Sequence, residues 1–202
     1  MRQILSALVL LASIAHAKQS AKQGLSQSLK HAKNKTACDY IHPEELPKEC
    51  FCKEPGPFSL LVQCNKKFTN KYFNDTIGMK IDVEPCNPLG SSISLDVVEK
   101  DHDIDYTITG IRAGESKNIP IPGLSILVPG IGHLGVDAAV YIGGNPDQLT
   151  LKVGLNACVA VSDKNMCASS IPGLKKILPW YVLSGTYAFG EICKNNATLA
   201  EM

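Results

Sequence analysis

The chain has 202 residues, of which 45% are hydrophobic and 19% are charged, and its formal net charge at pH 7 is +1. A chain of this length and apolar content can bury a core of ordinary size within one domain. The balanced charge argues against nucleic acid as a partner, because proteins that bind nucleic acid usually present a strongly basic face.

The chain opens with the pattern of a cleavable secretion signal. Met1-Arg2-Gln3 supplies a short positive start, residues 4–14 form an apolar run, and Ala15-His16-Ala17 matches the small-x-small pattern that signal peptidase reads. The run is shorter than the roughly 20 apolar residues that span a bilayer. We therefore predict a signal peptide over residues 1–17, a secreted mature protein that begins at Lys18, and no transmembrane segment.

The next segment, residues 18–37, is rich in Lys, Gln, Ser and Ala and has almost no large apolar side chains. Such a composition cannot bury enough apolar surface to offset the entropy lost on ordering, so we predict a flexible basic arm. A cysteine-framed domain is expected over residues 38–193, followed by a polar tail over residues 194–202.

Eight cysteines follow the secretion signal: Cys38, Cys50, Cys52, Cys64, Cys86, Cys158, Cys167 and Cys193. An even number of cysteines in an oxidising compartment predicts that all of them pair, here as four disulfides. Cys50 and Cys52 are too close in sequence to be expected partners of each other. Cys158 and Cys167 flank a turn-forming Ser-Asp-Lys-Asn stretch and are expected to pair, whereas the other pairings stay open. The two CxxC pairs that are typical of a cysteine-based zinc site do not occur.

Three sequons place expected N-glycans at Asn34, Asn74 and Asn196. Such triplets also occur by chance, so they argue for secretion only together with the signal pattern and the cysteines. We predict a secreted glycoprotein in which all three asparagine side chains are exposed.

Within the domain, apolar residues recur with a period of two, which is the pattern of half-buried β-strands. Residues 92–99 and 103–111 form one predicted hairpin, which turns at Asp101-His102 and pairs Val97 with Tyr106 and Leu95 with Ile108. Residues 136–142 and 149–157 form a second hairpin around the turn at 143–147. Shorter strands are expected over residues 58–64, 77–83 and 187–192.

These strands and the Gly, Pro and Asn turns between them predict an antiparallel all-β domain, because no stretch of the domain shows a long helical period. The predicted architecture is a disulfide-stapled β-sandwich of two sheets. An up-and-down barrel is the alternative.

The most acidic stretch lies at the tip of the first hairpin. Asp101, Asp103 and Asp105 imitate the start of an EF-hand loop, but Tyr106 and Arg112 stand where that loop requires Gly and Glu, so an EF-hand is excluded. Two interpretations stay open. The three aspartates form a looser calcium site, or they are a solvated hairpin end that discourages edge-to-edge aggregation.

Two Gly- and Pro-rich apolar segments, residues 121–129 and 171–179, resemble each other, and we expect each to be a Pro-Gly corner that leads into a short apolar strand. The first lies within residues 119–136, which carry no formal charge, and the second leads to the only tryptophan. Two interpretations stay open here as well. The segments line a lipid pocket or pack in the core, and the residues concerned are Leu124, Ile126, Leu178 and Trp180.

The sequence contains no complete catalytic or nucleotide-binding motif. Residues 130–135 match GxGxxG, but a strand-like segment follows where a dinucleotide-binding loop requires a helix. Neither GxSxG nor HExxH occurs, and the histidines of the mature chain have no shared spacing. A Ser-His-Asp triad that assembles only in space stays open, because triads are defined by geometry. We predict a protein that is not an enzyme.

One family resemblance bears on function. Val83-Glu84-Pro85-Cys86-Asn87-Pro88 is similar to the Val-x-Pro-Cys-Pro strand end of the MD-2/NPC2-type lipid-recognition family, and Ile119-Pro120-Ile121-Pro122 resembles its proline-rich segment. The similarity covers these short pieces, and the number of cysteines and the long insert between Pro122 and Cys158 depart from the family. The resemblance implies a secreted, disulfide-stapled sandwich that holds a lipid between its sheets.

The sequence thus predicts a secreted, non-enzymatic, disulfide-rich glycoprotein with one of two functions. It is a component of an extracellular matrix or surface, including the organic matrix of a biomineral, where the acidic hairpin contacts calcium. Alternatively, it carries a lipid or a small apolar ligand. No cofactor other than calcium is expected.

Overall fold

The computed structural model describes residues 35–194 apart from residues 57, 70, 72 and 162–163. The predicted signal peptide, nearly all of the predicted arm, most of the polar tail, Asn34 and Asn196 lie outside the described residues. No helix within the described ranges is long and apolar enough to cross a membrane.

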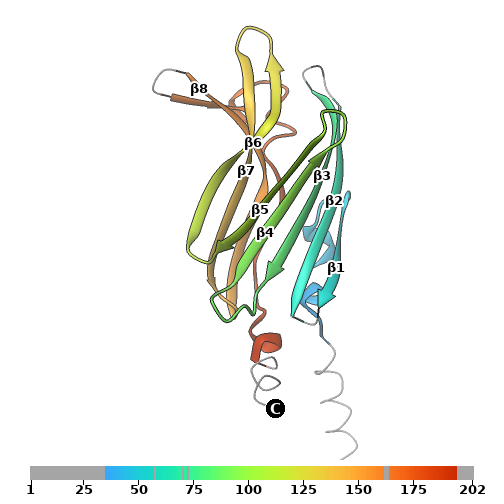
Figure 1. Cartoon of the computed structure of the whole chain (residues 1–202), viewed down its shortest axis with the longest axis vertical. Helices are drawn as coiled ribbons and strands as arrows, with labels where there is room; N and C mark the ends of the chain where they lie inside the picture. Colours follow the sequence, from blue (N-terminus) through green and yellow to red (C-terminus); the bar gives the residue numbers. More distant parts are fainter. Residues whose placement is uncertain (1–34, 57, 70, 72, 162–163, 195–202) are drawn as a thin grey trace, which may run out of the picture. The chain divides into compact units, whose positions relative to one another are not determined.

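The described residues form two antiparallel sheets stacked as a sandwich (Figure 1). In the first sheet each strand pairs with the next along the chain: β1 (Cys50–Gly56), β2 (Ser59–Thr69), β3 (Asn74–Glu84), β4 (Ser92–Glu99) and β5 (Ile104–Arg112). The second sheet has the order β10 (Trp180–Tyr187), β8 (Gln148–Val161), β7 (Gly132–Asn145) and β6 (Glu115–Val128), and short β9 (Lys164–Cys167) pairs with β8. The sheets do not close into a barrel, so the predicted sandwich is confirmed.

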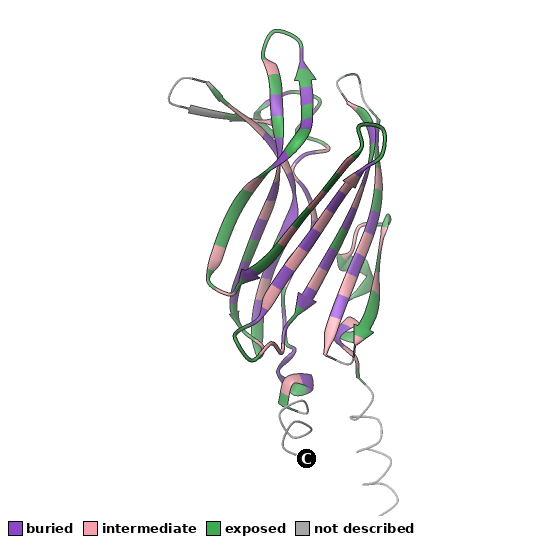
Figure 2. Cartoon of the chain, in the orientation of Figure 1, coloured by how far each residue is buried: buried purple, intermediate pink, exposed green. Residues whose placement is uncertain are grey.

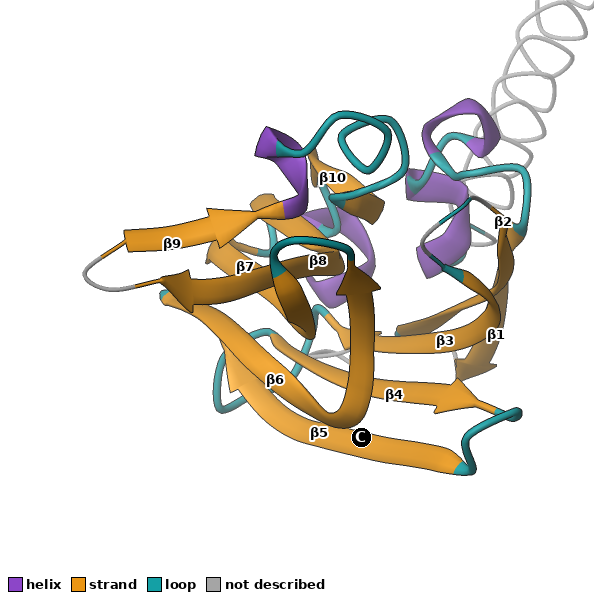
Figure 3. Ribbon diagram, turned by 90° about the horizontal axis from the view of Figure 1, so that it is seen from above, coloured by secondary structure: helices purple, strands orange, loops and turns teal. Residues whose placement is uncertain are grey.

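Short helical segments flank the sheets. They are the 3-10 helices η1 (Ala37–Tyr40), η2 (Pro43–Glu45) and η3 (Ala168–Ser170), and a single helical turn over residues 190–194. Seen from above, the two sheets form separate layers that come together where β5 leads into β6 (Figure 3).

Alternating burial explains why these segments are strands. Along β4 every second side chain is buried, and the stripes of buried and exposed residues are visible along most strands in Figure 2. Successive side chains of a strand point to opposite faces of the sheet. Strands with this alternation place their apolar side chains in the space between the sheets, where both inner faces contribute to one buried core.

Both predicted hairpins are present, and the first has the predicted register. In the first, Val97 lies opposite Tyr106 and Leu95 opposite Ile108. In the second, Val136 lies opposite Ala157, and the pairing continues to the turn. The first hairpin turns through Asp103, whose φ of 56° lies in the left-handed region that aspartate tolerates better than most residues.

The predicted strand at 187–192 is wrong. Strand β10 ends at Tyr187, and residues 190–194 are helical. The Phe189 carbonyl accepts the N–H groups of Ile192 and Cys193, each at 3.1 Å, which turns the chain back before it can continue in the sheet.

The expectation of two similar corners is also wrong. The first segment lies inside β6, where the pairing with β7 shifts register between Pro120 and Ser125. Gly123, with φ 83°, allows this irregularity because glycine adopts positive φ without steric cost. The second segment, residues 171–179, is a chain of turns that leads into β10.

Four disulfides hold the fold, and no cysteine in the described part of the chain is free. The predicted Cys158–Cys167 bridge is confirmed and joins β8 to β9. The pairings that the sequence left open are Cys38–Cys52, Cys50–Cys64 and Cys86–Cys193. The last spans 107 residues and ties the end of β3 in the first sheet to the helical turn that follows the second.

Candidate functional site

Three side chains with metal-ligating atoms meet at the end of the first sheet where β3 begins and β4 ends. Asp75 is the second residue of β3, Glu99 is the last residue of β4, and His102 lies in the turn that follows. The Nδ1 atom of His102 lies 2.8 Å from Oε2 of Glu99 and 3.3 Å from Oδ2 of Asp75. We call this group the hairpin-tip cluster.

The two carboxylates of the cluster are buried, and the imidazole is exposed. The side chains of Asp75 and Glu99 are 2% and 0% exposed, whereas that of His102 is 65% exposed. Both acids face the interior because they continue rows of inward apolar residues, Asp75 before Ile77 and Glu99 after Val97. Burial of two acids in such rows is unusual, since Asp and Glu are almost never fully buried unless they are paired.

Backbone N–H groups hold both carboxylates in place. Oδ1 of Asp75 accepts the N–H of Thr76 at 2.8 Å. Oε1 and Oε2 of Glu99 accept the N–H groups of Asp101 and His102, each at 2.7 Å. Glu99 therefore shapes the β4–β5 turn as well as facing the cluster.

The cluster shifts the pKa values of its members in opposite directions. Burial, together with the hydrogen bond to Glu99, raises the pKa of Asp75 to about 6. Burial would also raise the pKa of Glu99, but the hydrogen bonds from Asp75, from two backbone N–H groups and from His102 lower it to about 2. The hydrogen bond to Glu99 and its negative charge raise the pKa of His102.

The cluster is not the site that the sequence predicted. Asp101, Asp103 and Asp105 are exposed, and among the described residues the one group of three ligand atoms within 4.8 Å of one another is Asp75, Glu99 and His102. Sequence reasoning missed Asp75 because it lies on another hairpin. A signal for both acids was nonetheless present, since each interrupts an inward apolar row at its end.

The sequence left open whether four apolar residues line a lipid pocket or pack in the core. In the structure all four belong to the buried core. Leu124, Ile126, Leu178 and Trp180 are 3%, 1%, 3% and 7% exposed. The Trp180 ring packs edge-on against Phe68, with 5.6 Å between the centroids, so an aromatic contact joins the start of β10 to the first sheet.

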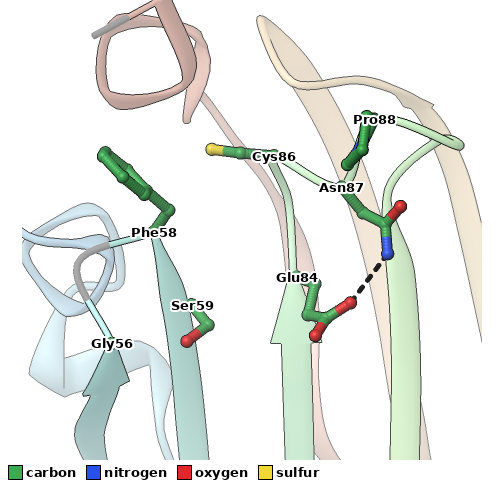
Figure 4. Close-up of a pocket in the computed structure, with 7 residues that line it drawn as sticks. All are labelled: Gly56, Phe58, Ser59, Glu84, Cys86, Asn87 and Pro88. Atoms are coloured by element: carbon green, nitrogen blue, oxygen red, sulfur yellow. Dashed lines mark hydrogen bonds between the residues drawn. The ribbon is translucent and has the colours of Figure 1, made fainter. Parts of the chain in front are cut away.

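Two hollows open on the outside of the sandwich. One of about 320 Å³ lies between the start of β2 and the turn after β3, and it contains much of the segment that resembles the lipid-recognition family (Figure 4). Within it, Asn87 donates a 2.8 Å hydrogen bond to Glu84. A second, of about 480 Å³, lies over the outer face of the first sheet, where Gly78 has no side chain between Asn65 and Val98.

A serine and a histidine meet on the β6–β7 hairpin, but the described residues do not complete a triad with them. The Ser125 hydroxyl lies 3.1 Å from Nδ1 of His133, and both residues are exposed. Within the described residues no aspartate contacts this histidine. The GxGxxG segment forms the turn of the same hairpin and leads into β7 rather than into a helix.

Of the three predicted glycosylation sites, only Asn74 lies within the described residues. It is the first residue of β3 and is exposed, as predicted.

No protein-family model matches the chain. No curated protein and no solved structure matches it either.

Proposed function

We propose that the protein is a secreted, non-enzymatic glycoprotein that serves as a component of an extracellular matrix or surface, including the organic matrix of a biomineral. The four disulfides fit a disulfide-rich extracellular protein, because such bridges persist in oxidising compartments and are rare in reducing ones.

The observation that carries the proposal is the packing of the sandwich interior. A carrier encloses most of its ligand in an apolar cavity. Here Leu124, Ile126, Leu178 and Trp180 are part of the packed core, and the hollows described above open on the outside. This arrangement favours a protein that works through its surface over one that encloses an apolar ligand.

The surface itself supports a non-enzymatic function. The exposed Ser125–His133 pair lies on the β6–β7 hairpin and lines neither of the two hollows described above. In the hollow of Figure 4, the Glu84 carboxylate already accepts hydrogen bonds from Asn87 and Ser92, at 2.8 and 3.2 Å. That carboxylate is therefore held by its neighbours rather than presented to a substrate.

Sequential extraction of the source tissue tests the proposal. The tissue is treated with isotonic buffer, then with EDTA, and finally with denaturant and reductant, and the chain is followed with an antibody. A matrix component is expected mainly in the last two fractions. Native mass spectrometry of the recovered protein should show no bound lipid.

The competing function makes the opposite prediction. A lipid carrier is recovered in isotonic buffer with about one apolar molecule per chain. Saturable binding of a fluorescent fatty acid or sterol by the recombinant mature protein would likewise contradict the matrix proposal. In that case Leu178→Ala should weaken binding, whereas the exposed residue Leu127, changed to Ala, serves as the control.

A further inference from the structure

We propose that Asp75, Glu99 and His102 form a binding site for one divalent transition-metal ion of the zinc class. The site goes beyond the function proposed above and does not depend on it, since either a matrix protein or a carrier could hold the ion.

The first argument is charge. Two carboxylates are buried at the cluster, and the exposed imidazole of His102 pairs with both of them. When both acids are ionised, even a protonated His102 leaves one negative charge without compensation. A buried charge needs a partner or a metal ion, and a divalent cation at this point neutralises both carboxylates while His102 is neutral.

The second argument is geometry. Zn²⁺ binds imidazole nitrogen and carboxylate oxygen at about 2.0–2.2 Å, so two donors around a tetrahedral ion lie roughly 3.3–3.6 Å apart. Oδ2 of Asp75 is 3.3 Å from Nδ1 of His102, and Oε2 of Glu99 is 2.8 Å from it. The first distance already lies in this range, and the second enters it when the exposed imidazole moves away from Glu99 by about half an ångström. The open side of the cluster leaves room for water as the fourth ligand.

The third argument is the support behind the donors. Metal ligands are commonly oriented by outer hydrogen bonds, and losing these bonds weakens binding. The Thr76 N–H occupies Oδ1 of Asp75 and leaves Oδ2 for the ion. The N–H groups of Asp101 and His102 fix the orientation of the Glu99 carboxylate. Ion binding therefore requires little reorganisation of the backbone.

The donor set selects the class of ion. Ca²⁺ takes roughly six to eight oxygen ligands, whereas the cluster offers two carboxylates and a ring nitrogen. Imidazole nitrogen suits zinc and related transition metals. The exposed Asp101, Asp103 and Asp105 are not part of this donor set.

Proton competition gives the site a characteristic pH dependence. A metal ion requires a neutral imidazole and ionised carboxylates, so affinity falls as protons bind. Affinity for the ion is therefore expected to decrease from pH 7.5 to pH 5.5.

Isothermal titration calorimetry tests the proposal on mature, oxidised protein that carries no polyhistidine tag and has been stripped with EDTA. At pH 7.5, Zn²⁺ should bind at one ion per chain, and His102→Ala should weaken binding at least about tenfold. His102 is exposed, so this variant should fold even if Asp75→Asn does not. His133→Ala, which removes another exposed histidine, and Asp105→Asn, on the same hairpin, should bind Zn²⁺ like the parent.

Three results would overturn the proposal. The first is the absence of saturable Zn²⁺ binding by the parent protein. The second is binding that survives His102→Ala and is lost in His133→Ala. The third is a parent protein that prefers Ca²⁺ and loses it in Asp105→Asn, which would place the cation at the predicted aspartates instead.

Discussion

The long-range disulfide Cys86–Cys193 should contribute more to stability than the local bridge Cys158–Cys167. The two bridges span 107 and 9 residues, and all four cysteines are half-buried, so the packing lost on substitution by alanine is similar. If a bridge acts by restricting the unfolded chain, removal costs about 4.8 kcal/mol for the long loop and about 2.6 kcal/mol for the short one. The expected difference is about 2 kcal/mol.

Equilibrium unfolding in guanidinium chloride measures this difference. The double variants Cys86→Ala/Cys193→Ala and Cys158→Ala/Cys167→Ala are compared with the parent protein, and the free energy of unfolding is extrapolated to water. In thermal unfolding, the difference corresponds to a melting temperature about 4–8 °C lower for the first variant. Equal losses of unfolding free energy in the two variants, or a larger loss for the local bridge, would refute the chain-entropy argument. Such a result would indicate that the β8–β9 bridge stabilises the folded state directly.

Three further predictions concern the core and the hairpin tip. In the presence of EDTA, the free energy of unfolding should rise as the pH is lowered from 7.5 to 5. The reason is that folding raises the pKa of Asp75, so the folded state binds a proton in this range that the unfolded state does not. In urea titrations, Asp75→Asn should flatten this pH dependence. In the same assay, Gly154→Ala should lower the free energy of unfolding by about 1–3 kcal/mol, because the added Cβ collides with the backbone of Trp180. The control is Gly135→Ala, which should cost less because its Cβ meets only the Cys158 carbonyl, at 3.8 Å. Leu178→Ala should cost about 2–5 kcal/mol as a core truncation, and a cost no greater than that of the exposed Leu127→Ala would show that Leu178 does not pack as described.

The parts of the fold that could be predicted from the sequence are the local ones. Both hairpins were predicted, and the first was predicted with its register, because alternation on each strand constrains the other across a short turn. The Cys158–Cys167 bridge was predicted from the turn-forming residues between its cysteines, which lie opposite each other on β8 and β9. Local pattern therefore predicts sheet pairing well in a meander, where each strand pairs with its neighbour in sequence.

The remaining parts depend on contacts between distant segments. The bridge from Cys86 to Cys193 requires that the sheets be stacked before the two cysteines meet. The strand predicted over residues 187–192 gives way to a helical turn at that same end. Local apolar spacing continues through Tyr187 and Phe189, so alternation alone could not show where β10 ends.

The hairpin-tip cluster shows why interrupted patterns are informative. Replacing a buried charged group by an apolar residue of similar volume is often neutral or stabilising, so an acid in an inward apolar row needs another explanation. Glu99 has a structural one, because it accepts the two N–H groups that shape the β4–β5 turn. Asp75 accepts one N–H through Oδ1, but its Oδ2 faces His102 and the second carboxyl group. Asp75 can hydrogen-bond to Glu99 when it is protonated. In the proposed site its Oδ2 binds the cation once both acids are ionised, and Asp75 is therefore the residue on which the metal proposal depends most.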